Sequence, residues 1–355
     1  MPLPHTMPTP LRLLSFALFT VFLIGLPIHS AHAADDAALR DEALGYFEPL
    51  PDKPVFKNEN PANKEKLELG KMLYFETRLS KSNVFSCASC HNLSTGGVDN
   101  NPFSTGHKWM VGGRNAPTVL NASLHIAQFW DGRAADVEAQ AQGPILADVE
   151  MGATQKLVLK RLGSIPEYVY RFGKAFPNEK EPLRYENIAN AIGAFERTLL
   201  TPSRFDSFLK GDNKALTEKE KEGLRIFMNI NCAGCHNGPA VGGNGYQKFG
   251  VVKKPKNMED LGRFGVTKAE EDKNVFKIPS LRNIELTYPY FHDGRHWKLE
   301  DAVKDMALYQ LGEPVSRDDV DAIVAFLKSL TGKMPDIVLP ILPPSTDSTP
   351  IPDRN

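Results

Sequence analysis

The sequence has no excess of positive or negative charge, which argues against nucleic acids and anionic membranes as partners. Its 355 residues include 42 Lys and Arg against 43 Asp and Glu, a formal net charge of −1. Nucleic acids and anionic membranes both select proteins with a basic face. The remaining composition, 41% hydrophobic and 24% charged, is typical of a globular protein of about two domains.

Long apolar runs are also scarce, and the one that stands out is near the N-terminus. Arg12 precedes an apolar run over residues 13–28, and the small-x-small sequence Ala31-His32-Ala33 follows it. The run is short for a membrane span, and the small residues are typical of a cleavage site. We therefore expect residues 1–33 to be a signal peptide cleaved before Ala34. The mature protein is predicted to lie in the periplasm without a membrane span.

The sequence has only four cysteines, and they form two identical motifs. Cys87-Ala88-Ser89-Cys90-His91 and Cys232-Ala233-Gly234-Cys235-His236 are both C-x-x-C-H, the attachment signature of c-type haem. Two thiols three positions apart lie on one side of a helical turn, where they can form thioethers with the two vinyl groups of one porphyrin. The adjacent histidine then ligates the iron. We predict two covalently attached haems, with His91 and His236 as iron ligands.

Two other uses of these cysteines are disfavoured. Disulfides are usual in an exported protein, but two disulfides would leave both adjacent histidines unexplained. Zinc takes four ligands, and each motif supplies three with no second cysteine pair nearby. The glycine-rich segment 242–245 lacks the Lys-Ser/Thr of a phosphate-binding loop, and it is better explained as a tight turn at the haem edge.

The sequence around the motifs is repeated. The segment 116–121 (APTVLN) matches 278–283 (IPSLRN), and 129–133 (FWDGR) matches 291–295 (FHDGR). The spacing between the matching segments is conserved, since 130 − 117 = 13 and 292 − 279 = 13. These matches indicate a duplicated haem domain.

The hydrophobic periodicity is mainly helical, and strand signals are few. Apolar residues recur at i, i+3/i+4 spacing over 188–199, 301–309 and 320–330. We predict a mainly α protein with two cytochrome-c-like helical haem domains related by internal duplication. Its predicted parts are an N-terminal domain over 34–200, a C-terminal domain over 201–334, and a Pro-rich tail over 335–355. The tail is either disordered or extended on the surface.

The second axial ligands decide what each haem can do. Met306 lies on a predicted helix 14 residues after His292, since 306 − 292 = 14. A His/Met pair raises the reduction potential, although a methionine on an apolar stripe is often core filler. In the first half, His107 lies in a glycine-rich loop, and Met110 is a rival ligand. A bis-His iron has a low potential and no open position, so His107 would have to leave before a substrate binds.

The two halves differ at the position that carries Met306. The first half has Pro144 there, with Gln140 and Glu150 nearby. One haem thus resembles a closed electron carrier, and the other is flanked by acid/base groups, which suggests electron storage at one and catalysis at the other. Without further context, Glu150 would be assigned as a solvated or helix N-terminal carboxylate, and Trp130 as core. For His292 we favour packing, or a hydrogen bond to a haem propionate.

These motifs resemble a known family. The first half contains SCASCHNLSTGGVD, GHKW, RNAPTVLN, AQFWDGRA and GPILADVEM, and the second contains NCAGCHNGPAVGGNGY and PSLRNIELTYPYFHDG. Together they closely resemble the bacterial di-haem cytochrome c peroxidases, over roughly residues 44–331. The C-terminal tail and His125 are features that the resemblance does not explain.

The resemblance implies a role for each candidate residue. His91 and His107 would be the axial ligands of an N-terminal, low-potential, peroxidatic haem, and His236 and Met306 those of a C-terminal, high-potential haem. The remaining assignments are as follows: Glu150 and Gln140 as the acid/base and hydrogen-bonding groups, Trp130 in the electron path, and Asn115 with the backbone of Thr287 and Pro289 as ligands of calcium, which prefers oxygen.

The predicted function is reduction of hydrogen peroxide to water, with electrons from a small cytochrome c or a blue-copper protein. The resemblance also implies a homodimer. Two alternatives are a non-enzymatic di-haem electron carrier and an oxidase resembling the methylamine dehydrogenase maturation enzyme. That relative has a Tyr ligand at the second haem and no displaceable His, so Met306 and His107 favour the peroxidase branch.

Overall fold

The computed structural model describes residues 28–354 apart from residues 257 and 313, together with residue 1. Most of the predicted signal peptide, residues 1–33, therefore lies outside the described residues. Among the described helices, none is both long enough and apolar enough to cross a bilayer. The helices and strands are α1 (Ile28–Leu44), α2 (Lys64–Tyr74), α3 (Cys87–Cys90), α4 (Val137–Leu146), α5 (Gln155–Gly163), α6 (Pro166–Ala175), α7 (Tyr185–Glu196), α8 (Arg204–Leu209), α9 (Glu218–Asn229), β1 (Tyr246–Lys248), α10 (Phe264–Thr267), β2 (Val275–Lys277), α11 (Leu299–Met306) and α12 (Arg317–Ser329).

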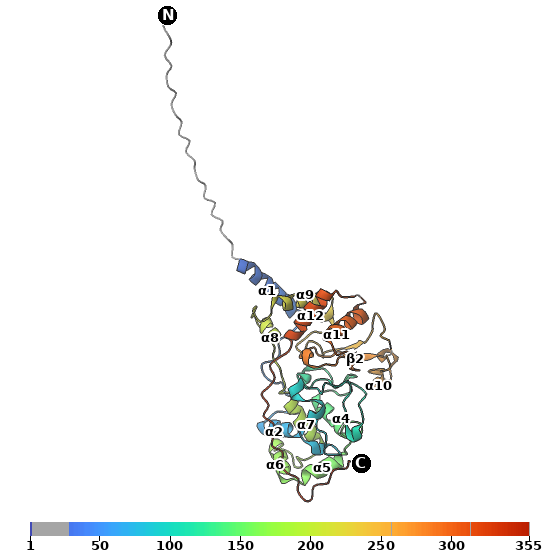
Figure 1. Ribbon diagram of the computed structural model, residues 1–355. Helices are drawn as coiled ribbons and strands as arrows, with labels where there is room; N and C mark the ends of the chain where they lie inside the picture. The colour runs from blue at the N-terminus through green and yellow to red at the C-terminus, as the bar shows by residue number, and fades with distance from the viewer. Residues whose placement is uncertain (2–27, 257, 313, 355) are drawn as a thin grey trace.

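The molecule is mainly helical, as predicted, and its helices form two groups. Figure 1 shows α2, α4, α5, α6 and α7 at one end, and α1, α8, α9, α11 and α12 at the other. Each group encloses its own hydrophobic core. The two short strands β1 and β2 pair antiparallel, with Tyr246 opposite Lys277 and Lys248 opposite Val275.

A glycine-mediated helix crossing occurs once in each core. A Cβ on Gly70 of α2 would lie 1.9 Å from the Ala191 carbonyl oxygen of α7, and a Cβ on Gly223 of α9 would lie 1.9 Å from that of Ala322 in α12. Only glycine allows backbones to approach so closely. The same crossing in both cores supports the duplication inferred from the sequence.

The loops between the matching segments also have the same backbone path. Asn121 and Asn283 have φ of 60° and 58°, and Phe129 and Phe291 have φ of 68° and 71°. A single antiparallel bridge closes the turn in each repeat. Left-handed φ is uncommon for a bulky residue such as Phe, so its recurrence at matching positions is a strong sign of common geometry.

One segment lies outside the domain to which it was assigned. Leu39, Ala43 and Phe47, at four-residue spacing, are buried in the core of the second helix group. The Phe47 and Phe205 ring centroids are 5.3 Å apart, edge to face. The start of the predicted domain 34–200 thus packs on the C-terminal helices, because its apolar face fits between α8 and α9. The division at residue 200 is otherwise kept as a proposal.

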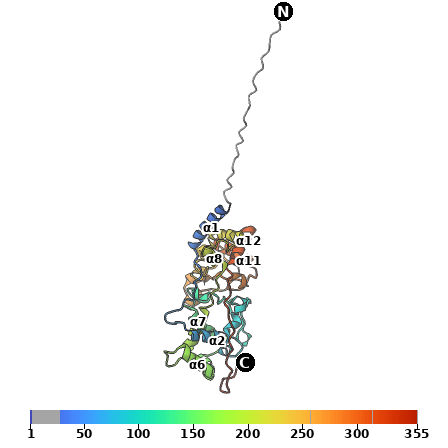
Figure 2. The same cartoon turned by 90° about the vertical axis from the view of Figure 1, so that its left-hand side faces the viewer.

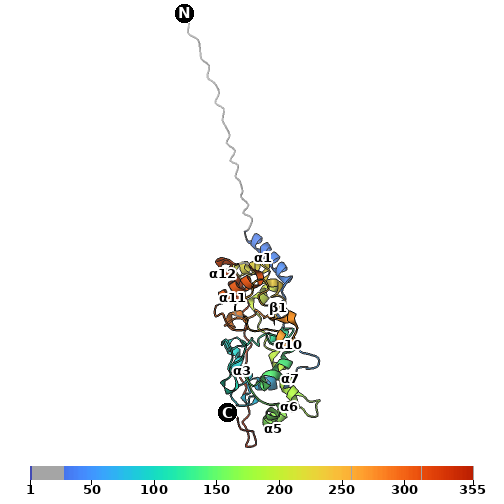
Figure 3. The same ribbon diagram turned by 90° about the vertical axis from the view of Figure 1, so that its right-hand side faces the viewer.

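The C-terminal tail is extended, which is one of the two predicted outcomes. It runs from α12 along the N-terminal helices, and Figures 1, 2 and 3 place the C-terminus at the opposite end of the molecule from α1. Met334, Ile337 and Leu342 pack against the N-terminal core. The guanidinium of Arg161, which is fully buried, donates to the carbonyls of Pro350 (3.3 Å) and Ile351 (3.1 Å).

Candidate functional site

The two C-x-x-C-H motifs form the same local turn. In each, the backbone N–H of the histidine donates to the carbonyl of the first cysteine, at 2.9 Å for both His91 and His236. Ser86 and Ser89 form a capping box around α3, so the first motif has a fixed helical start. All four cysteines are free thiols. The disulfide alternative is therefore not supported by the geometry.

Burial shifts the pKa values of both motif histidines and of motif cysteines in each half. Burial lowers the pKa of His236 to about 4 and also lowers the pKa of His91, so both imidazoles are neutral, as iron ligation requires. Burial raises the pKa of Cys90 to about 11 and that of Cys232 to about 12. Buried, protonated thiols are poor nucleophiles, which argues against a thiolate enzyme.

Each motif lies beside a large cavity. The cavity at the second motif contains about 1730 Å³ of non-atom space including its opening to solvent, and that at the first contains about 2100 Å³. The histidine and at least one cysteine of each motif line its cavity, so each cavity lies where a haem attached to that motif would be held. We call them the C-terminal cavity (Cys232, Cys235, His236) and the N-terminal cavity (Cys90, His91).

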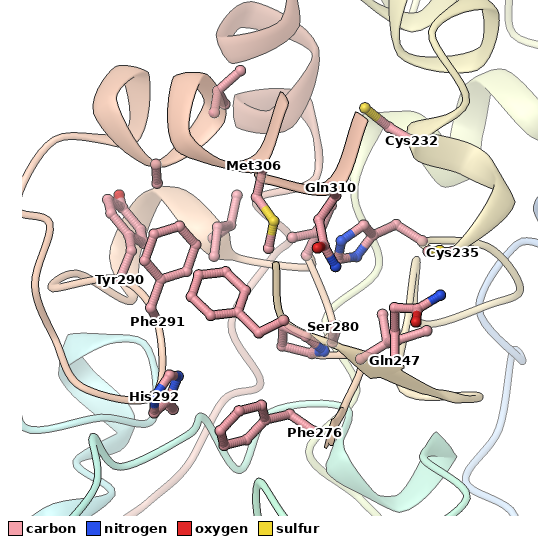
Figure 4. Close-up of a pocket in the computed structure, with 18 of the residues that line it drawn as sticks. Cys232, Cys235, Gln247, Phe276, Ser280, Tyr290, Phe291, His292, Met306 and Gln310 are labelled. Carbon is pink, nitrogen blue, oxygen red and sulfur yellow. The ribbon is translucent and has the colours of Figure 1, made fainter. Parts of the chain in front are cut away.

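Met306 lines the C-terminal cavity with His236. Figure 4 shows Met306 and Gln310 entering this space between Phe291 on one side and the Cys232 and Cys235 pair on the other. Met306 ends α11, and the chain continues as a π-helical turn over Ala307–Leu311. The structure thus places the predicted thioether at the predicted haem site.

The polar candidates line the N-terminal cavity. Gln140, on α4, and Glu150, in the loop after α4, both face it, together with Arg133. Burial raises the pKa of Glu150, and the nearby Arg133 opposes this by lowering it. The carboxyl is therefore neither a fully solvated group nor the cap of a helix, and it can exchange protons with a molecule in the cavity.

His107 does not line the N-terminal cavity in this structure, although it is adjacent to it. Its ring is buried against Gly152, whose Cβ would lie 2.8 Å from His107 Cδ2. Its backbone N–H donates to the carbonyl of Glu150 at 2.6 Å. Lys108 and Trp109, which follow, both have left-handed φ, of 57° and 60°. The His107 loop and the Glu150 loop are thus tied to each other by this hydrogen bond, and the imidazole is not among the groups that line the N-terminal cavity.

Trp130 lines both cavities. Its indole N–H donates to the Asn115 carbonyl at 2.8 Å, which fixes the ring. His292 also lines both cavities, and its ring stacks on Phe276 at a centroid distance of 4.3 Å. Packing is one of the two roles that we favoured for His292 from sequence, and the structure shows the ring packed in this way.

The predicted calcium ligands all line one cavity. Asn115, Thr287 and Pro289 all line the C-terminal cavity. The Asn115 side chain donates through Nδ2 to the Asn101 carbonyl at 2.8 Å, which directs its Oδ1 elsewhere. An amide oxygen with two backbone carbonyls is a donor set of the kind that calcium takes.

Several residues at the cavities were missed from sequence. Glu196 lines the N-terminal cavity. Burial and the charge of Glu138 raise its pKa to about 8, although the charge of Arg197 lowers it. The sequence feature that could have indicated Glu196 is that it is the only acidic residue in the apolar helical segment 188–199. Arg133 lies in the repeated FWDGR segment, and Lys277 is the last residue of the short strand β2. Nothing in a single sequence distinguishes these cations from surface residues.

Comparisons with known proteins agree with this arrangement. A family model described as di-haem cytochrome c peroxidase matches residues 64–214, and one described as cytochrome c matches residues 220–331. The chain is 52% identical over 320 residues to the cytochrome c551 peroxidase of Pseudomonas aeruginosa, covering 89% of this chain and 92% of that protein. It is 50% identical over 333 residues to the cytochrome c551 peroxidase of Nitrosomonas europaea, covering 93% and 96%.

A more distant relative and a solved structure extend the comparison. The methylamine utilization protein MauG of Methylorubrum extorquens is 34% identical over 331 residues, covering 88% of this chain and 92% of that protein. The crystal structure of a MauG-like protein associated with microbial copper homeostasis superposes with a TM-score of 0.72 at 27% identity, covering 80% and 95%. The chain therefore belongs to the di-haem cytochrome c peroxidase family.

Proposed function

We propose that this protein is a periplasmic di-haem peroxidase that reduces hydrogen peroxide to water with electrons from a small cytochrome c or a cupredoxin. One observation carries the proposal: two unlike cavities share Trp130, and one contains Met306 while the other contains Glu150 and Gln140. Relatives at 50% identity and above are named cytochrome c551 peroxidase, which supports it.

The donor sets fit two c-type haems. Cys87, Cys90 and His91 would hold one, and Cys232, Cys235, His236 and Met306 the other. When attached, the haems supply the iron that binds peroxide and the redox centres that store electrons. The His/Met pair makes the C-terminal centre the easier to reduce, because the thioether favours ferrous iron. Trp130 provides an aromatic path between the two cavities.

The N-terminal cavity supplies the proton chemistry. Glu150 would take a proton from one peroxide oxygen and deliver it to the other, so that the O–O bond breaks and the second oxygen leaves as water. Two electrons from the donor protein and two protons from solvent would convert the remaining oxygen to a second water. The amide of Gln140 would orient the peroxide by hydrogen bonding. Such positioned proton transfer contributes on the order of 10²–10⁴ in rate.

His107 is proposed as a displaceable ligand of the N-terminal haem. Its imidazole lies outside the cavity here, and its loop contains two residues in a strained conformation that costs about 1–3 kcal/mol each. Both observations support a loop with two arrangements. Because His107 N–H is bonded to the Glu150 carbonyl, movement of one loop would carry the other with it.

We also propose that calcium binds at the contact between the two halves, to Asn115 Oδ1 and the carbonyls of Thr287 and Pro289. Assembly of the protein as a homodimer is a separate part of the proposal. Export by a cleaved signal peptide is part of the same proposal.

The test is steady-state peroxide consumption by the two-haem protein with a reduced donor cytochrome, measured with and without pre-reduction. Turnover is expected. No turnover in either state would indicate an electron carrier. Oxidation of a methylamine dehydrogenase precursor without peroxidase turnover would indicate the MauG-like alternative.

A further inference from the structure

Lys277 is a buried cation that faces the C-terminal cavity. It ends β2, is 6% exposed, and lines the same cavity as Cys235 and His236. Among the described residues that line this cavity, Lys277 is the only Lys or Arg, and none is Asp or Glu. Burial lowers the pKa of Lys277 to about 8, and no neighbouring carboxylate raises it. A buried ammonium of this kind is costly without an anionic partner.

His125 positions this ammonium from the other half of the molecule. Its Nδ1 lies 3.4 Å from Lys277 Nζ, and burial with the nearby Lys277 charge lowers the pKa of His125 well below its usual value. The imidazole is therefore neutral and can accept a hydrogen bond. The ring occupies space left by Gly243, where a Cβ would lie 2.3 Å from His125 Cδ2. This explains both the glycine turn and the histidine that the family resemblance left without a role.

The same lysine is tied to the aromatic residue between the cavities. Its backbone N–H donates to the carbonyl of Trp130 at 2.7 Å. Phe249 and Phe276, which also line this cavity, are apolar. A haem carries two carboxylates, its propionates, and no carboxylate of the described residues lines this cavity to compete for the cation.

We propose that Lys277, positioned by His125, binds a propionate of the haem attached to Cys232 and Cys235 and thereby raises the reduction potential of that haem. The inference rests on haem attachment at the second motif, which is part of the proposed function, but not on peroxide reduction. A positive charge beside the haem disfavours the ferric state, which carries one more positive charge than the ferrous state. Met306 and Lys277 would then change the reduction potential in the same direction.

The experiment is a spectroelectrochemical titration of the purified two-haem protein, comparing wild type with K277M, K277R and H125A. For K277M we expect a lower midpoint potential at the C-terminal haem, so that its ferrous-to-ferric ratio at a fixed potential falls about tenfold, the order of a lost charge interaction in a low-dielectric site. K277R keeps the charge and should stay near wild type. H125A should shift the potential in the same direction as K277M, but by less.

Lys248 provides the matched control, because it lies on the paired strand β1 with an exposed side chain. K248M should leave both potentials unchanged. Equal potentials in K277M and K248M, or equal shifts in K277M and K277R, would overturn the inference. If K277M does not accumulate with two haems, K277Q replaces it in the same comparison. A wild-type protein with only one haem would instead count against the proposed function.

Discussion

Asn121 and Asn283 donate their side-chain amides to the same oxygen, Thr201 Oγ1, each at 2.8 Å. They occupy matching positions in the two repeats, and Thr201, in the segment that joins the repeats, is fully buried. Asn121 Oδ1 also accepts from the Thr201 N–H at 3.0 Å. A single hydroxyl thus joins the two halves of the duplication.

We expect Thr201→Val to lower the free energy of unfolding by roughly 2–4 kcal/mol, because each buried donor left without an acceptor costs about 1–3 kcal/mol. Urea unfolding followed by circular dichroism measures this. Thr201→Ser should keep most of the stability. Thr198→Val is a suitable control, since its hydroxyl donates only to the carbonyl of Phe195 in its own helix turn. A T201V protein as stable as T198V would show that the shared hydrogen bonds contribute nothing.

A buried ion pair should make stability fall in acid. Arg282 and Asp206 are joined by two hydrogen bonds of 2.8 Å, and their side chains are 0% and 4% exposed. Burial alone would raise the pKa of Asp206, but the charge and hydrogen bonds of Arg282 lower it overall. A carboxyl with a lowered folded pKa stabilises the protein above its unfolded pKa of about 3.9, and this contribution is lost as the pH falls through the folded pKa.

Asp206→Asn should therefore cost about 3–5 kcal/mol at pH 7, because the buried guanidinium loses its counter-charge. It should also remove this acid-dependent part of the stability below about pH 4. Unfolding curves at several pH values measure both effects. The same pH dependence in wild type and D206N would contradict the assignment. Asp52→Asn, at an exposed pair with Lys210, is the control and should change little.

Glu150→Gln should lower kcat/KM for peroxide by about 10²–10⁴, because the amide cannot accept and return the proton. The haem content and both reduction potentials should stay as in wild type. Glu167→Gln, at an exposed ion pair with Arg171 on α6, is the matched control. Retention of activity in E150Q would remove Glu150 from the mechanism.

Met306→Ala should lower the reduction potential of the C-terminal haem markedly, because a thioether ligand favours ferrous iron. Met228 is buried in the core of the same helix group but does not line the cavity. Met228→Ala should therefore cost stability without changing the potential. If both variants titrate like wild type, Met306 is a packing residue and not a ligand.

Much of the site could be predicted because covalent haem attachment leaves a local sequence pattern. Three patterns are local in the sequence: the two motifs, the repeated segments and the helical periodicity. The structure has the turns and helix crossings that these patterns predict. Gln140 and Glu150, predicted from a difference between the repeats, do face one cavity, and Met306 faces the other.

The remaining features depend on contacts between distant segments. The packing of Leu39, Ala43 and Phe47 on the second core could not be predicted, because their apolar spacing would suit either core. Lys277 and His125 lie 152 positions apart, and each alone resembles an ordinary residue. The position of the His107 ring follows from its packing against Gly152, which the sequence pattern does not encode.

The extended tail keeps the two ends of the described chain at opposite ends of the molecule. A fluorophore or an electrode linker attached after Arg354 would lie at the end formed by the N-terminal helices, near Lys81, which pairs with Asp353 at 3.1 Å. One attached before Asp35 would lie at the other end, where Arg225 pairs with that carboxylate at 2.6 Å. Wiring the molecule to a surface through one terminus or the other would therefore select which of the two cavities lies nearer the electrode.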